Sequence, residues 1–101
     1  MNMTLKDAKE HVGKGWHKLL EEYYGRRPKG VITLDVKEKF GGLRIADGGR
    51  CTTDWLSYVS SLEAQSLRTC EFCGDPGVPR NLNGWIKTTC QTCYNQKSKG
   101  E

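Results

Sequence analysis

The sequence has few apolar residues and no long apolar run. Hydrophobic residues account for 36% of its 101 residues, and aromatic residues for 9%. A helix that crosses a bilayer needs about 20 consecutive apolar residues, so we expect no membrane-spanning segment. The first seven residues, Met1 to Asp7, lack the apolar stretch of a secretory signal, which favours a cytoplasmic protein. A core this small needs additional stabilisation, which a metal ion or disulfides can provide.

The sequence also lacks a recognisable set of catalytic residues. Its two histidines, His11 and His17, are six residues apart, a spacing that does not place them on one helix face. The pairs Gly41-Gly42 and Gly48-Gly49 lack the strand–turn–helix context of a phosphate-binding loop. Cys51 stands beside an arginine, which favours a reactive thiolate, but a small apolar filler is the simpler interpretation. We therefore expect no enzymatic activity.

Four of the five cysteines form two Cys-x-x-Cys pairs, sixteen residues apart. This spacing is typical of a zinc site with four thiolate ligands. Zn²⁺ binds thiolates in a tetrahedron at about 2.3 Å, so we expect one structural zinc ion, held by Cys70, Cys73, Cys90 and Cys93. Disulfides are the first alternative, although the fifth cysteine and the missing secretory signal favour a reducing compartment. A redox Cys-x-x-Cys is the second, and it needs only one pair.

Length and pattern predict a single compact unit of the α+β class. We expect residues 1–69 to form a body of helix, antiparallel β-hairpin and helix, and residues 70–101 to form a zinc ribbon or knuckle module packed on it. Four thiolates leave a zinc ion no open position for water. The metal is therefore expected to hold the fold together rather than to catalyse a reaction.

Apolar periodicity places the first elements of the body. Residues 4–24 repeat apolar side chains at helical spacing, and Gly13 and Gly15 predict a break in the middle. Residues 31–37 and 43–46 alternate apolar and polar side chains, as the two strands of a hairpin do. The side chains expected to face the core are Ile32, Leu34, Val36, Leu43 and Ile45.

Capping and turn residues place the later elements. A threonine, Thr52 or Thr53, begins a second helix that we expect to run to about residue 68. Asn83-Gly84 predicts a β-hairpin between the two cysteine pairs, because both residues tolerate positive φ. Residues 94–101 are polar and are expected to form no more than one helical turn.

The net charge of +4 comes mainly from the first 30 residues, which carry seven Lys or Arg against four Asp or Glu. The simple interpretation is a solvated helix face followed by a basic loop. The functional interpretation is a contact with phosphates or with an acidic protein surface. The residues that would form a basic track for nucleic acid are Lys14, Lys18, Arg26, Arg27, Lys29, Arg80 and Lys87.

The most distinctive segment is Val36-Lys37-Glu38-Lys39-Phe40-Gly41-Gly42-Leu43-Arg44. Together with Gly15-Trp16, the run from Leu67 to Gly74 and the run from Gly84 to Cys90, it resembles small uncharacterised proteins of phages and prophages. Those relatives often carry Cys-x-x-His at the second pair, where this sequence has Cys93. The resemblance implies a phage origin, hence the cytoplasm of a host cell, and a metal-stapled fold.

These observations favour a binding protein that docks on a host protein or ribonucleoprotein complex, as an inhibitor of host defence of the anti-CRISPR kind. The alternative is a zinc ribbon that binds nucleic acid or assists transcription, with an affinity that falls steeply with salt. A homodimer through an exposed aromatic patch is a further option. The turn at Gly41-Gly42 has two possible arrangements. Either it displays Lys37, Lys39 and Arg44 to a partner, or it folds tightly with Phe40 tucked under the sheet. The residues expected to meet a partner are Lys37, Lys39, Arg44, Arg26, Arg27, Lys29, Arg80 and Lys87.

Overall fold

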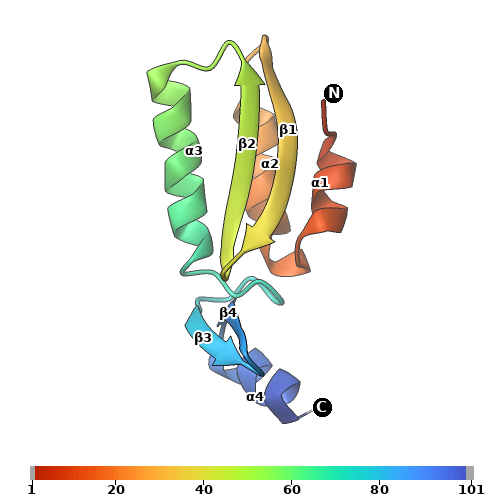
Figure 1. Cartoon of the computed structure of the whole chain (residues 1–101), viewed down its shortest axis with the longest axis vertical. Coiled ribbons are helices and arrows are strands. Elements are labelled where there is room, and N and C mark those ends of the chain that lie inside the picture. Colours follow the sequence, from red (N-terminus) through yellow and green to blue (C-terminus); the bar gives the residue numbers. More distant parts are fainter. Residues whose placement is uncertain (1, 100–101) are drawn as a thin grey trace.

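The computed structural model describes residues 2–99 and confirms the α+β class, with four α-helices and two antiparallel hairpins (Figure 1). None of the helices in this range is long and apolar enough to cross a bilayer. The elements are α1 (Leu5–His11), the 3₁₀ turn η1 (Lys14–Trp16), α2 (His17–Arg26), β1 (Val31–Lys39), β2 (Gly42–Gly49), α3 (Thr53–Ser66), β3 (Val78–Leu82), β4 (Trp85–Thr89) and α4 (Gln91–Lys99).

The body is one two-stranded sheet with helices on a single face and at both sides. Figure 1 shows α2 behind β1 and β2, α3 along the β2 side and α1 along the β1 side, so that the near face of the sheet carries no helix. The core fills the space between the sheet and these helices. Its largest fully buried side chains are Trp16, Tyr23, Leu20, Leu43, Leu62 and Val36.

Local signals in the sequence set the starts of the helices. Thr4 accepts a hydrogen bond from the Asp7 amide, and Thr52 accepts one from the Trp55 amide, so each threonine caps the helix that follows it. The break expected around Gly13 and Gly15 is present, since α1 ends at His11 and α2 begins only after η1.

Two expectations about the core face of β1 are wrong, because neither Ile32 nor Leu34 faces the core. The pairing of β1 with β2 shifts between Thr33 and Asp35, so Leu34 is an extra residue in a β-bulge. The side chains that face inward are therefore Val31 and Thr33 before the bulge and Val36 after it, while Leu34 is 49% exposed. An extra residue reverses the alternation of side chains, which a regular strand pattern does not anticipate.

A buried polar network explains why a threonine occupies the core at this bulge. The Tyr23 hydroxyl lies 2.7 Å from Thr33 Oγ1 and donates to Asp47 Oδ1 at 2.9 Å. Trp55 Nε1 donates to the second oxygen of Asp47 at 2.6 Å, and Arg27 donates to Thr33 at 2.7 Å. Burial raises the pKa of Tyr23, which keeps its hydroxyl protonated as a donor. The network satisfies polar atoms of α2, α3 and both strands.

Both edges of the sheet are closed by groups from the neighbouring segments. On the β2 side, the Leu43 and Ile45 amides donate to Ser66 and Glu63 of α3 at 2.8 and 2.9 Å. On the β1 side, the Met3 amide donates to the Thr33 carbonyl at 2.7 Å, and a ring nitrogen of His11 lies 3.0 Å from the Val36 carbonyl. A two-stranded sheet is thus held without exposed ladder groups at these positions.

The last third of the chain packs directly on the body. The backbone of residues 70–74 lies so close to η1 that a Cβ on Gly15 would be 2.0 Å from the Cys70 carbonyl oxygen. The Gly15 amide donates to the Glu71 carbonyl at 2.9 Å, and Trp16 Nε1 donates to the Thr69 carbonyl at 2.9 Å. Only glycine allows this approach, so the residues that break the helix also seat residues 70–99, which carry the four clustered cysteines and which we call the metal module.

The chain beyond Cys90 is more ordered than expected. The helix α4 spans nine residues, Gln91–Lys99, rather than a single turn. The second cysteine pair thus stands at the start of a helix, whereas a ribbon would place it in a second β-turn. Gly100 and Glu101, which the expected tail included, lie outside the described residues.

Replacing Gly15 by alanine is expected to lower the free energy of unfolding by about 2–3 kcal/mol, because the added Cβ overlaps the Cys70 backbone. Gly25 is the matched control, since its Cβ would meet nothing within 4 Å inside α2. Gly25→Ala is expected to leave stability unchanged or to raise it by about 0.5–1 kcal/mol. Urea unfolding of both variants checks this, and equal midpoints would contradict the packing argument.

Candidate metal centre

Each of the four cysteines is placed by a different local structure. Cys70 follows the turn that ends α3, and Cys73 closes a knuckle in which the Gly74 amide donates to the Cys70 carbonyl at 2.9 Å. Cys90 follows β4, and Cys93 lies in the first turn of α4. The β3–β4 hairpin between the pairs turns at Asn83-Gly84 with positive φ at both residues, which confirms the expected turn. The hairpin therefore brings the second pair back to the first.

The four sulfur atoms form one cluster. All four Sγ atoms lie within 4.8 Å of one another, and Cys73 Sγ is 3.6 Å from Cys90 Sγ. A tetrahedron with metal–sulfur bonds of about 2.3 Å has edges of about 3.8 Å. The cluster thus has the size that one tetrahedral metal ion requires. All four cysteines are free thiols in the structure, so neither pair forms the disulfide considered above.

The surroundings of Cys70, the buried cysteine of the cluster, favour its thiolate, whereas burial and the neighbouring sulfurs raise the pKa of the Cys93 thiol. Burial acts to raise the pKa of the Cys70 thiol, but backbone amides at residues 90, 73 and 72 outweigh it and bring the pKa to about 7. The Cys93 amide donates to Cys90 Sγ at 3.4 Å, at the start of α4. A thiolate is the form that binds metals.

A buried acid beside the cluster connects it to the rest of the chain. Glu71 is 4% exposed, and its carboxylate accepts a hydrogen bond from the Thr88 amide and pairs with Lys87 at 3.6 Å. Lys87 also pairs with Glu38 of β1 at 3.3 Å. Burial raises the pKa of Glu71, and Lys87 opposes that shift. Thr88 in turn donates to the Gly41 carbonyl at 2.7 Å, so the turn of the body hairpin rests on β4.

The remaining candidates for chemistry have structural partners. A ring nitrogen of His17 lies 2.8 Å from the Lys9 carbonyl, and His11 bonds to β1 as described above. Cys51 is half-buried beside the core, and its thiol donates to the Gly48 carbonyl at 3.5 Å. None of these three side chains approaches the cysteine cluster within the range that defines a metal site in residues 2–99.

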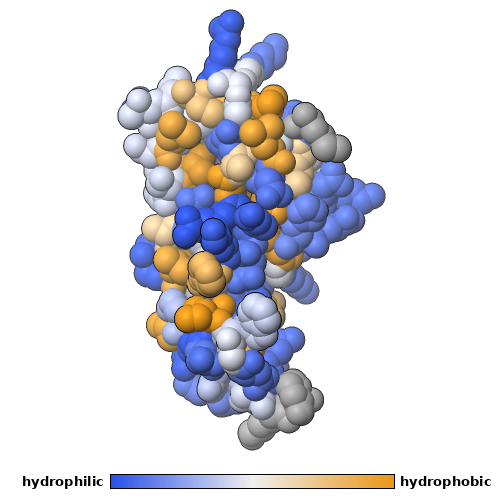
Figure 2. Space-filling view, viewed as in Figure 1, coloured by the Kyte–Doolittle hydropathy of each residue, from blue (hydrophilic) through white to orange (hydrophobic). Residues whose placement is uncertain are grey.

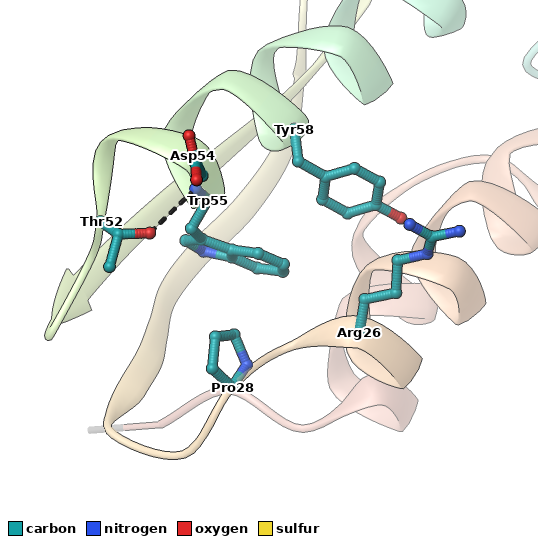
Figure 3. A pocket seen from close by; sticks show the side chains of 6 residues that line it. All are labelled: Arg26, Pro28, Thr52, Asp54, Trp55 and Tyr58. Carbon is teal, nitrogen blue, oxygen red and sulfur yellow. Dashed lines mark hydrogen bonds between the residues drawn. The ribbon is translucent and has the colours of Figure 1, made fainter.

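A hollow of about 490 Å³ lies between the end of α2 and the start of α3. Figure 3 shows Pro28 on one side of it and the rings of Trp55 and Tyr58 on the other, with Arg26 beside Tyr58. The Arg26 guanidinium lies 5.2 Å from the centre of the Tyr58 ring, and Trp55 is only 6% exposed. The polar groups of Thr52 and Trp55 already serve as a cap and as a donor to Asp47. The hollow is therefore shaped mainly by contacts that hold the helices together.

Several of the basic residues expected to meet a partner are engaged within the fold. Arg27 lies 4.9 Å from the centre of the Tyr24 ring, and Arg80 lies 5.3 Å from that of Tyr94. Lys87 is held between two carboxylates, and Arg26 packs on Tyr58. Arg26, Arg27 and Lys29 follow one another at the end of the sheet farthest from the metal module (Figure 1).

Lys37, Lys39 and Arg44 instead lie together on or beside the uncovered face of the sheet. Lys37 is paired with Arg44 across the two strands, so both side chains point to the same face. Within residues 2–99, Lys37 has one ion pair, with Asp35 at 4.0 Å, and Lys39 and Arg44 have none. Figure 2 shows hydrophilic side chains gathered over this part of the sheet. These three residues form a cationic surface, which we call the sheet-face cations.

Comparisons with models of protein families, with curated proteins and with solved structures found no match. The comparisons therefore supply no function for the chain.

The cluster is expected to take up one equivalent of a thiophilic divalent metal per chain. Titration with Co²⁺ should end at one equivalent and give the intense thiolate-to-cobalt absorption of a tetrahedral site. Cys93→Ser should weaken metal binding by more than about 100-fold, since losing a ligand costs more than the 10–100-fold typical of outer-shell changes.

Cys51→Ser is the matched control for this titration, because Cys51 lies outside the cluster. It should bind the metal as the unaltered chain does. An equal loss in both variants, or no uptake by the unaltered chain, would contradict a four-cysteine site.

Proposed function

We propose that the metal is zinc and that it serves the fold. Four thiolates select soft or borderline metals, and Zn²⁺ accepts a tetrahedron without a preference of its own. With four protein ligands, the ion has no open position for a substrate or water. The free energy of binding to such sites is on the order of 10 kcal/mol and contributes directly to folding. The support is the size of the sulfur cluster and its position where β4, α4 and the knuckle meet.

The function we propose is non-enzymatic docking on an acidic surface of a larger macromolecule. The observation that carries it is the set of sheet-face cations, on the one face of the sheet that no helix covers. Charges that already have partners add little to binding, whereas Lys39 and Arg44 have no acidic partner within 4.0 Å among the described residues. Complementary charge speeds encounter and selects the partner.

We propose a protein or ribonucleoprotein complex of a host cell as the partner, which docking would block or redirect. The support for this choice is the resemblance of the segment from Val36 to Arg44 to phage proteins, because that segment also contains all three sheet-face cations. Inhibition of a host defence complex is the corresponding role.

The proposal predicts that reversing the sheet-face cations abolishes docking. Lys37→Glu, Lys39→Glu and Arg44→Glu together should weaken capture of the partner from host lysate by at least about 100-fold, because opposed like charges cost several kcal/mol. The matched control reverses Lys6, Lys14 and Lys18, three exposed lysines of the first two helices and the turn between them, and it changes the net charge equally. The control should capture the partner normally.

The same experiment separates docking on protein from binding to nucleic acid. Capture that survives nuclease treatment supports the proposal. Capture that nuclease or moderate salt removes, and that the control triple also loses, would favour the basic track instead. If the metal-loaded chain captures no specific partner, the proposal is wrong.

A further inference from the structure

Three exposed apolar side chains gather where the body meets the metal module. Phe40 is 73% exposed, Leu67 is 42% exposed and Ile86 is 46% exposed. A Cβ on Gly41 would be 3.3 Å from a methyl group of Ile86, and one on Gly42 would be 3.2 Å from a methyl group of Leu67. The glycine turn thus lies between Leu67 and Ile86, and Phe40 precedes it. We call Phe40, Leu67 and Ile86 the junction patch. Figure 2 shows apolar residues at this junction, directly below the hydrophilic part of the sheet.

The backbone of the turn holds Phe40 in an unusual position. Phe40 has a φ of 53°, in the left-handed region that large side chains rarely adopt. The Gly41 amide donates to Glu38 Oε2 at 2.8 Å, which fixes the turn from within. The ring consequently points into solvent and does not tuck under the sheet, which was one of the two expected arrangements. Positive φ at both Phe40 and Gly41 is what a two-residue hairpin turn of this kind requires.

The junction patch continues into a groove between β2 and α3. The groove has a volume of about 270 Å³, and both Phe40 and Leu67 line it. Lys39 and Arg44 line the same groove, and Lys39 Nζ is 5.9 Å from the centre of the Phe40 ring. Apolar walls and cations therefore border one opening, which is large enough for a single side chain of medium size.

We infer that this groove receives an apolar anchor side chain from an acidic protein segment. The inference rests on the proposed function. It specifies which kind of partner side chain is bound, which the sheet-face cations alone do not determine. The anchor removes the exposed surface of Phe40 and Leu67 from water, and the acidic residues beside it pair with Lys39 and Arg44. Such an arrangement, an apolar centre with a charged rim, is that of a protein interface.

A second copy of this chain fits the junction patch less well. A two-fold contact centred on the patch would bring the cations of both copies together. Nucleic acid also fits less well, since Phe40 is the one aromatic ring of the patch on which a base could stack, whereas Leu67 and Ile86 are aliphatic. Glu63 lines the groove as well, and its carboxylate accepts a hydrogen bond from the Ile45 amide.

The test uses the full, metal-loaded chain and synthetic peptides of defined composition. The first peptide has twelve residues, Glu and Asp with a central Leu-Phe pair. In the second peptide serine replaces that pair, and in the third lysine replaces every acid. A twelve-residue oligo-dT is the nucleic-acid probe. Titration to millimolar concentration, followed by backbone amide NMR shifts, should show saturable changes around residues 39–44 and 67 with the first peptide only.

Phe40→Asn removes the ring without harming the turn, because asparagine tolerates the left-handed region better than phenylalanine. This variant should unfold at the same or a higher temperature and bind the first peptide about tenfold more weakly, which corresponds to about 1.4 kcal/mol. The control is Trp85→Ser, since Trp85 is equally exposed at 73% but points to the other face of β4. Its affinity should not change.

The outcomes separate this inference from the proposed function. Equal binding by Phe40→Asn and the unaltered chain, a preference for oligo-dT, or a dimer in sedimentation that Phe40→Asn disperses would each overturn the inference. Partner capture that survives Phe40→Asn but not reversal of the sheet-face cations would leave the proposed function standing without it. If Phe40→Asn and the reversal of the sheet-face cations both leave partner capture unchanged, the inference and the proposed function are both wrong.

Discussion

The contact on which the structure depends is the approach of the Cys70 knuckle to the backbone at Gly15. This approach leaves no room for a side chain at position 15. It is reinforced by a hydrogen bond from the buried indole of Trp16 to the Thr69 carbonyl, in the turn after α3. On the opposite side, Thr88 holds the turn of the body hairpin. The segment that carries the cysteine cluster is therefore joined to the body both by close backbone packing at Gly15 and by the hydroxyl of Thr88 at the turn that displays Phe40.

Charge is divided in this molecule between groups that hold the fold and groups left for solvent or a partner. Arg27, Arg80 and Lys87 contact aromatic rings or carboxylates within the fold. Replacing them would therefore lower the stability of the fold more than it would affect binding. Lys39 and Arg44 stand beside an apolar patch and form no ion pair within 4.0 Å among the described residues. A count of basic residues hides this difference, because the net charge treats both groups alike. The arrangement favours a local docking surface over a long electrostatic track.

Signals confined to a few neighbouring residues were sufficient to predict much of the fold. The threonine caps, the Asn83-Gly84 turn and the two cysteine pairs each act within four residues, so the sequence alone reveals them. The bulge at Leu34 was not predictable in this way. It places Thr33 in the core, where Thr33 bonds to Tyr23, which in turn bonds to Asp47. The role of Gly15 likewise depends on Cys70 and Glu71, which lie far along the chain. The helix α4 was missed because its polar sequence has no apolar face to mark it.

Closed sheet edges limit how another protein can recognise this chain. Strand addition, which relies on free backbone groups and tolerates many sequences, is blocked where α1 and α3 occupy the ladder positions. Recognition through the sheet must then proceed by side chains on its open face. A pairing that depends on a few charged side chains can be lost by exchanging one or two of them, so recognition of this kind would be narrow in range.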